Sequence, residues 1–75
     1  MRVREKLKEF SATQWYKHGD HRKVNKLPEH ELVGTVIVAG GLVEVVHPGD
    51  WILEDWDRVV RYCKADKFRQ DYEVI

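Results

Sequence analysis

Apolar and polar positions alternate along this chain in the manner of β-strands over most of its length. The clearest strand covers residues 33–39 (Val-Gly-Thr-Val-Ile-Val-Ala), which are rich in β-branched side chains. Gly40 and Gly41 follow it, and residues 42–46 (Leu-Val-Glu-Val-Val) form a second apolar run. Two such runs joined by a Gly-Gly pair predict a β-hairpin.

A second turn separates residues 42–46 from the apolar residues 51–53. It contains Pro48, Gly49 and Asp50. Proline fixes φ near the value that a turn needs, glycine tolerates positive φ, and an aspartate side chain can bond its own backbone two residues further on. The sequence therefore predicts a second hairpin around this Pro-Gly-Asp turn.

Residues 8–16 alternate as expected for a strand with two different faces. One face carries Phe10, Ala12 and Gln14, and the other carries Ser11, Thr13 and Trp15. The polar residues 17–31 follow as the longest loop, and residues 58–63 form the last expected strand.

The periodicity changes after Ala65. Phe68, Tyr72 and Ile75 recur at i, i+4 and i+7, which marks one face of a helix of three turns. Such a helix is marginal alone, so we expect it to pack on the sheet through Phe68 and Tyr72. The predicted fold is a single α+β domain over residues 1–75. It is a small antiparallel β-meander or half-open barrel of about five strands with a C-terminal helix.

Composition constrains the setting of the protein more than its function. Apolar residues make up 43% of the 75 positions, enough for one small core that homodimerisation would supplement. Cys63 is the single cysteine, so no disulfide can form within the chain. The N-terminal residues lack the apolar segment of a signal peptide, and no apolar run approaches the roughly 20 residues that span a bilayer. We therefore expect a cytoplasmic protein without a membrane partner.

The net charge is zero, but the charges are unevenly distributed. Residues 1–37 hold eight Lys and Arg against five Asp and Glu, whereas residues 38–75 hold five against eight. A dipolar chain of this kind can steer association with a partner or pair its own two halves, and the sequence leaves both readings open.

The C-terminal half repeats the order of a known motif. The matching residues are Pro48, Gly49, Asp50, Trp51 and Ile52, then Cys63, Lys64 and Asp66, then Phe68, Tyr72 and Glu73. In this order, and in an opening strand that ends in Gln-Trp at residues 14–15, the chain resembles small phage and prophage proteins named for a Pro-Gly-Asp-Tyr-Gly motif. This chain has Arg58 where that family usually has a glycine. The resemblance implies a phage or prophage origin and a small αβ domain, without an established activity.

The acidic turn at residues 54–57 is the first candidate site. It places Trp56 among Glu54, Asp55 and Asp57. Charged turns are common on protein surfaces, and paired carboxylates can also support acid–base chemistry or hold a divalent cation. A tryptophan in an exposed acidic patch can instead anchor a protein partner, which makes these four residues a candidate protein-binding site.

The basic loop at residues 17–26 is the second candidate site. Cations lie next to aromatic residues there, as in platforms that bind single-stranded nucleic acid. The candidate nucleic-acid-binding residues are Lys17, Arg22, Lys23 and Lys26, with Trp15 and Tyr16. The zero net charge argues against this function, because nucleic-acid-binding domains are usually basic.

Two further features could carry chemistry, and each has a simpler explanation. His18, Asp20 and His21 lie within four residues of a loop, but a structural zinc site needs four ligands. Cys63 ends an apolar strand, where a cysteine is usually a small buried hydrophobe rather than a nucleophile. We therefore expect no catalysis, no cofactor and no metal.

The function predicted from the sequence is that of a phage or prophage accessory protein. It would bind a host protein, of an identity that the sequence does not give, in the cytoplasm of the host cell and without catalysis. The alternative is a small nucleic-acid-binding module that uses residues 17–26.

Overall fold

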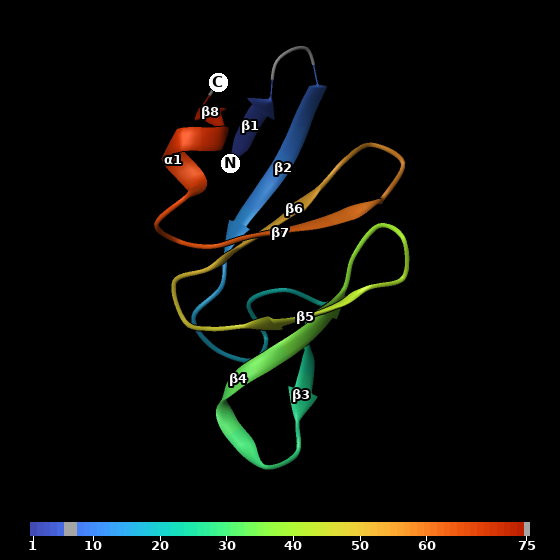
Figure 1. Ribbon diagram of the computed structural model, residues 1–75, viewed down its shortest axis with the longest axis vertical. Coiled ribbons are helices and arrows are strands. Elements are labelled where there is room, and N and C mark those ends of the chain that lie inside the picture. The colour runs from blue at the N-terminus through green and yellow to red at the C-terminus, as the bar shows by residue number, and fades with distance from the viewer. Residues whose placement is uncertain (6–7, 75) are drawn as a thin grey trace.

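The computed structural model describes residues 1–5 and 8–74 of the chain (Figure 1). Over these residues the chain forms eight strands and one short helix, arranged as two antiparallel sheets that do not close into a barrel. The domain is mostly β and elongated, with dimensions of 39 × 23 × 18 Å. No helix in the described part of the chain has the length and apolar character needed to cross a membrane.

The larger sheet has five strands, including the first and the last strand of the described residues. In spatial order these strands are β7 (Val60–Cys63), β6 (Trp51–Glu54), β2 (Lys8–Gln14), β1 (Arg2–Glu5) and β8 (Glu73–Val74). The smaller sheet is a meander of β3 (Asn25–Leu27), β4 (His30–Ile37) and β5 (Val43–Val46). Figure 1 shows β3 at one end of the long axis, and the helix α1 (Phe68–Asp71) with β1 and β8 towards the other.

The predicted hairpin around Gly40 and Gly41 is confirmed. β4 and β5 pair antiparallel, with Ile37 opposite Val43, and both glycines have positive φ (87° and 79°). The alternation predicted for residues 8–16 is also confirmed over β2, because Phe10 and Ala12 point into one core and Trp15, just after the strand, points into another.

The hairpin predicted around the Pro-Gly-Asp turn is wrong. β5 and β6 flank this turn but belong to different sheets, so the turn connects the two sheets. The physical reason is that β6 has no free edge: it lies between β2 and β7, so β5 cannot pair with it and pairs with β4 instead. The turn itself bonds to the end of β2, because the Gly49 N–H donates to the Trp15 carbonyl (2.7 Å) and the Trp15 N–H donates to the Asp50 carbonyl (2.8 Å).

The predicted positive φ of Gly49 is confirmed at 100°, but Asp50 does not bond the backbone two residues further on. Its Oδ2 accepts the N–H of His47 (2.9 Å) and the hydroxyl of Tyr62 (2.6 Å), and its Oδ1 accepts the N–H of Ala65 (3.2 Å). A single buried carboxylate therefore joins the end of β5, strand β7 and the segment that leads to α1.

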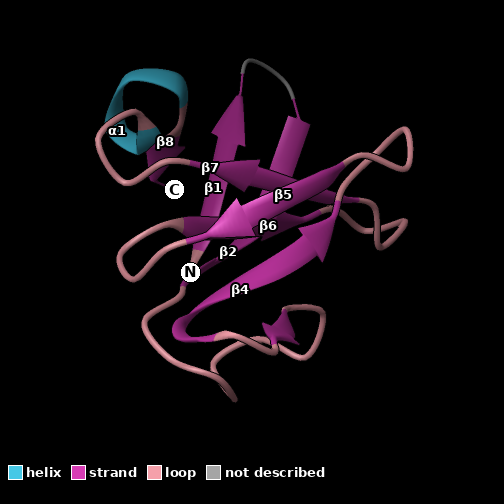
Figure 2. Ribbon diagram, turned by 60° about the horizontal axis from the view of Figure 1, so that its bottom comes forward, coloured by secondary structure: helices cyan, strands magenta, loops and turns pink. Residues whose placement is uncertain are grey.

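The core consists of two clusters, one on each face of the five-stranded sheet. Neighbouring residues of β6 point to opposite faces, so Leu53 belongs to the cluster with Phe10 and Phe68, and Ile52 to the cluster with Val36 and its sheet. Figure 2 shows β4 and β5 lying across β6 and β7, which is how the smaller sheet covers one face.

The C-terminal helix is shorter than predicted. α1 is a single turn, Phe68–Asp71, and at Tyr72 the chain becomes extended and enters β8; Ile75 lies outside the described residues. The predicted packing through Phe68 is confirmed, since its ring is buried and stacks on Trp51 with 3.9 Å between centroids. Tyr72 packs edge-on against Phe10 at 5.8 Å. Pairing of Val74 with Val3 ends the helix, because a strand cannot continue its periodicity.

Three strands lie where the sequence did not predict them. β1 is a charged segment, β8 has two residues, and β3 together with the start of β4 lies within the predicted loop 17–31. The chain therefore has more strands than the five that we expected, in two sheets instead of one.

Candidate protein-binding surface

The turn between β6 and β7 is held by backbone hydrogen bonds and by the carboxylate of Asp55. The Asp55 N–H donates to the Val59 carbonyl (3.1 Å), and the Arg58 N–H donates to the Asp55 carbonyl (2.9 Å). The Val59 N–H also donates to Asp55 Oδ1 (2.9 Å). These bonds close a hairpin loop of three residues, Trp56, Asp57 and Arg58. The loop is therefore fixed at its base by a carboxylate that is almost completely buried.

Arg58 adopts a left-handed backbone conformation, with φ of 64°. The last position of a three-residue hairpin loop commonly takes this conformation and is usually glycine. For a residue with a Cβ, this left-handed conformation costs about 1–3 kcal/mol. The turn thus retains a local strain that the surrounding hydrogen bonds have to hold.

Trp56 is the most exposed large apolar side chain in the described part of the chain, with 85% of its surface in water. An aromatic ring of this kind gains free energy when its roughly 150–250 Å² are removed from water. Tryptophan is also enriched among the few residues that dominate binding energy at protein interfaces. The turn therefore presents an indole ring that contributes nothing to either core of the protein.

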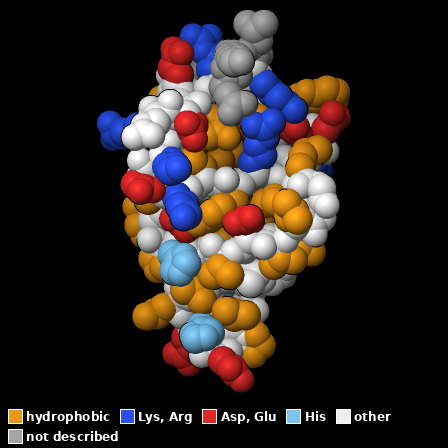
Figure 3. Space-filling view, in the orientation of Figure 1, with side chains coloured by type: hydrophobic (Ala, Val, Ile, Leu, Met, Phe, Trp, Pro, Cys, Tyr) orange, Lys and Arg blue, Asp and Glu red, His pale blue; other side chains and the backbone are white. Residues whose placement is uncertain are grey.

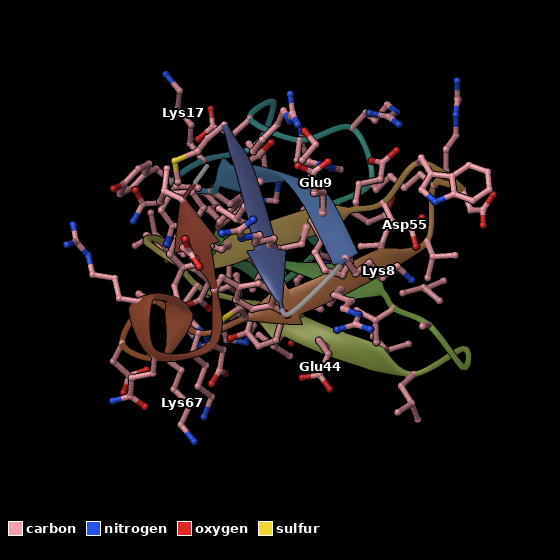
Figure 4. All side chains as sticks on the ribbon, turned by 90° about the horizontal axis from the view of Figure 1, so that it is seen from above. Lys8, Glu9, Lys17, Glu44, Asp55 and Lys67 are labelled. Atoms are coloured by element: carbon pink, nitrogen blue, oxygen red, sulfur yellow. The ribbon has the colours of Figure 1, made fainter. Side chains whose placement is uncertain are left out.

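The surroundings of Trp56 differ from the exposed acidic patch that the sequence predicted. Asp55 pairs with Lys8 (3.2 Å) and Glu54 pairs with Arg22 (2.6 Å). The Asp55 carboxylate is buried and that of Glu54 is mostly buried, whereas both cations are exposed. Figure 4 shows Lys8 from β2 lying beside Asp55. Of the three carboxylates in the turn, Asp57 is the one that faces water. The turn therefore presents the exposed cations of two ion pairs together with the carboxylate of Asp57, and not an acidic patch.

These ion pairs also show that the basic and acidic halves of the chain pair with each other. Lys8 and Arg22 belong to the basic half, and their partners Asp55 and Glu54 belong to the acidic half. Arg4 and Glu73 form another such pair at 3.0 Å. The two halves of the chain therefore neutralise each other within the molecule.

The pKa values of Asp55 and His21 are shifted by this local environment. The pKa of Asp55 lies below its usual value, chiefly because its carboxylate accepts the Val59 N–H, with a further contribution from Lys8. The pKa of His21 is also lowered, first because the ring is desolvated; Glu54, 3.5 Å away, opposes the shift. The anionic form of Asp55 is thus the one that fits the folded turn.

The predicted basic loop does not form one continuous surface. Trp15 is completely buried in the core, so its ring cannot stack on a base, whereas Tyr16 is exposed. Lys23 lies next to the turn, with its Nζ 3.4 Å from the Arg58 carbonyl, and Lys26 belongs to β3. Figure 4 shows Lys17 on the opposite side of the molecule from Asp55.

The side chains of His18, Asp20 and His21 form hydrogen bonds to the backbone of their own loop or of the neighbouring strand β4. Asp20 Oδ2 accepts the N–H groups of Tyr16 (2.9 Å) and Lys17 (3.1 Å), and His21 Nδ1 accepts the N–H of Lys23 (3.1 Å). His18 Nε2 lies 3.1 Å from the Val33 carbonyl oxygen. Among the described residues, no three His, Cys, Asp or Glu side chains are grouped to hold a metal ion.

Cys63 lies beside a groove of about 440 Å³ between β7, α1 and the β4–β5 hairpin. Burial raises the pKa of its thiol to about 11, and Asp71 and Asp50 add to the shift. A thiol with this pKa is protonated at neutral pH and is a poor nucleophile. The structure thus places Cys63 among core residues, as a cysteine at the end of an apolar strand usually is.

Comparison with known proteins supplies no further guide. No protein-family model matches the chain, and neither the curated proteins nor the solved structures contain a match.

Sequence reasoning missed two residues that shape the candidate surface. Lys8, predicted to begin a strand, also covers the carboxylate of Asp55 from 47 positions away along the chain, and no local pattern marks that contact. Arg58 takes the left-handed position in the turn. The sequence has no glycine at this position to mark the conformation. The one indication was the family resemblance, because the family usually has a glycine there, as such a loop end usually does.

Proposed function

We propose that this chain is a binding module without catalytic activity, and that it attaches to a partner protein through Trp56. The observation that carries the proposal is an indole that is 85% exposed on a turn fixed by three hydrogen bonds. A rigid anchor loses little conformational freedom on binding, so more of its burial free energy contributes to affinity.

The charges around Trp56 indicate the kind of partner surface that it fits. Lys8 and Arg22 lie on the solvent side of Asp55 and Glu54, and Lys23 contacts the backbone of the same turn. We propose that the partner offers an apolar pocket for the indole with carboxylates at its rim. Such a partner adds charge complementarity, which speeds association more than it strengthens binding.

The biological setting of this binding rests on the motif resemblance. The order of residues from Pro48 to Ile52 and from Cys63 to Glu73 supports a phage or prophage accessory protein that acts on a host protein in the cytoplasm. A small phage protein without chemistry can act by occupying a surface of its target.

Affinity capture from bacterial lysate tests the proposal. The immobilised wild type should retain a specific protein that Trp56→Ala fails to retain. Leu32→Ala is the matched control, because Leu32 is also an exposed apolar residue (77%) and lies on β4. Equal capture by the wild type and Trp56→Ala, or no specific capture by the wild type, would overturn the proposal.

The alternative function, nucleic-acid binding, has one observation in its favour. The contact between Lys23 and the Arg58 carbonyl places part of the basic loop beside an exposed aromatic ring, although that ring is Trp56 rather than Trp15. Binding of this kind weakens steeply with salt. An electrophoretic shift of single-stranded probes at low salt, abolished in Trp56→Ala, would favour it over a protein partner.

A further inference from the structure

The outer face of the three-stranded sheet is apolar and uncovered. Ile37 lies opposite Val43 and Thr35 lies opposite Val45, so these four side chains share one face of β4 and β5. Ile37 and Val43 are 59% and 63% exposed, and Val45 is 44% exposed. Val36, between Thr35 and Ile37, is completely buried on the other face. The strands therefore have apolar side chains on both faces, although only one face is packed.

The two β4–β5 pairs on this outer face also lack charge. Charged residues make up 35% of the chain, yet neither cross-strand pair on the outer face contains one. The charged residue of β5, Glu44, is the partner of Val36 and lies on the opposite face. On the side in view in Figure 3, lysines and arginines lie in the upper part, while the lower part has many hydrophobic side chains, with acidic residues at its end. A face of an antiparallel sheet that stays in water normally carries polar side chains.

The exposed area of the chain is larger than its mass predicts. The accessible surface is 5440 Å², whereas a compact protein of 8.9 kDa exposes about 4,800 Å². The excess of about 600 Å² reflects the elongated shape of the whole molecule and is similar in size to one partner's share of the smallest stable interfaces, which bury about 1,200 Å² in total. One partner seated on this chain would bring it to the exposure of a compact protein.

We propose that a second copy of this chain covers the outer face of β4 and β5, forming a two-fold dimer in which two three-stranded sheets pack face to face. A two-fold interface brings the same patch of both copies together, so the patch must complement itself. A neutral, β-branched surface meets this condition, because it places no like charges opposite each other. The net charge of zero also removes long-range repulsion between copies.

Static light scattering of the purified chain at about 100 µM tests the dimer, since the complex should have twice the 8.9 kDa mass of one chain. Val43→Lys introduces a charge opposite Ile37, at the most exposed pair of the face, and should weaken dimerisation at least about tenfold, a loss typical of an interface residue that becomes buried. Val74→Lys is the matched control, with the same substitution at a valine of similar exposure (58%) on β8. It should dimerise as the wild type does.

A second variant shows whether a loss of dimerisation comes from the interface or from a folding defect. Val43→Thr preserves side-chain shape and β-branching, so the strand is retained, and its dimer should dissociate several-fold more readily than that of the wild type. A monomeric wild type, or a dimer that both Val43 variants leave intact, would overturn the proposal. The test is independent of partner capture, because Trp56 lies outside this face. A dimer lost in Trp56→Ala but kept in Val43→Lys would place the interface at the other surface.

Discussion

The Pro48–Asp50 turn and the Asp55–Arg58 turn use the same chemistry for opposite purposes. In both, an aspartate carboxylate accepts backbone N–H groups and fixes the chain direction. Asp50 bonds three separate segments and lies between the two sheets. Asp55 bonds the other end of its own turn and one lysine, and leaves Trp56 in water.

This difference separates a residue that holds the scaffold from one that supports a surface. Loss of a carboxylate that joins distant segments should affect the whole fold, because each segment loses its position relative to the others. Loss of a carboxylate that closes one hairpin should affect that hairpin. Replacing residues at the two turns therefore separates an effect on the whole fold from an effect on the one turn that exposes Trp56.

The largest effect is expected for Asp50→Ala. The substitution leaves the Tyr62 hydroxyl and the Ala65 N–H without their acceptor, and hydrogen bonds to charged groups contribute about 1.5–3 kcal/mol each. We expect the free energy of unfolding in denaturant to fall by about 3–4 kcal/mol. Asp66→Ala, at an exposed aspartate, should change it by about 0.5 kcal/mol or less. Equal effects of the two variants would contradict the role of Asp50.

The same turn should make the protein sensitive to alkali. Burial, followed by the bond to Asp50, raises the pKa of Tyr62 above its ordinary value of 10.0. Because the folded state holds the proton more tightly than the unfolded state, this contribution to stability is present below pH 10 and is lost as the pH rises further. Tyr62→Phe should be less stable near pH 7 and lose less stability between pH 9 and 11 than the wild type. Parallel pH profiles would disprove this assignment.

The outer turn should be sensitive to acid instead. The pKa of Asp55 is lowered in the folded state, so its contribution is present above the ordinary value of 3.8 and is lost as the pH falls below it. Asp55→Asn cannot pair with Lys8 and should show a flatter stability profile in acid. Its amide exchange should accelerate at Arg58 and Val59 while β2 remains protected. Faster exchange throughout the sheet would show that Asp55 holds the scaffold as well.

A small gain in stability is expected for Arg58→Gly. Glycine adopts the left-handed conformation at φ of 64° without strain, although it adds entropy to the unfolded chain. The net change should be a gain of up to about 1 kcal/mol in the free energy of unfolding. Arg58→Ala removes the same side chain but keeps the strain, so it should show no gain. A stabilised alanine variant would mean that the guanidinium, and not the backbone, is unfavourable.

Local patterns predicted the elements whose signal lies within a few residues. The hairpin at Gly40, the two faces of β2 and the packing of Phe68 follow from glycine conformation and hydrophobic periodicity. The partner of β6 could not be predicted in this way, because β2 lies some forty positions earlier in the chain. The strands β1 and β8 exist through their pairing with each other and with β2, and their own residues carry little β signal.

The candidate surface was predicted in part for the same reason. The exposure of Trp56 agrees with its place in a charged turn between two strands. The covering of Asp55 and Glu54 by Lys8 and Arg22 depends on contacts between distant segments, so the turn looked acidic in the sequence. The burial of Trp15 depends likewise on the packing of the second sheet against it.

The central claim is that Trp56 serves binding and not folding, and the free energy of unfolding of Trp56→Ala tests it most directly. Measured in denaturant beside Asp50→Ala, it should differ from the wild type by no more than about 0.5 kcal/mol, as expected for an exposed residue without structural contacts. A loss of about 2 kcal/mol or more would contradict the claim, since it would show that the indole belongs to the scaffold.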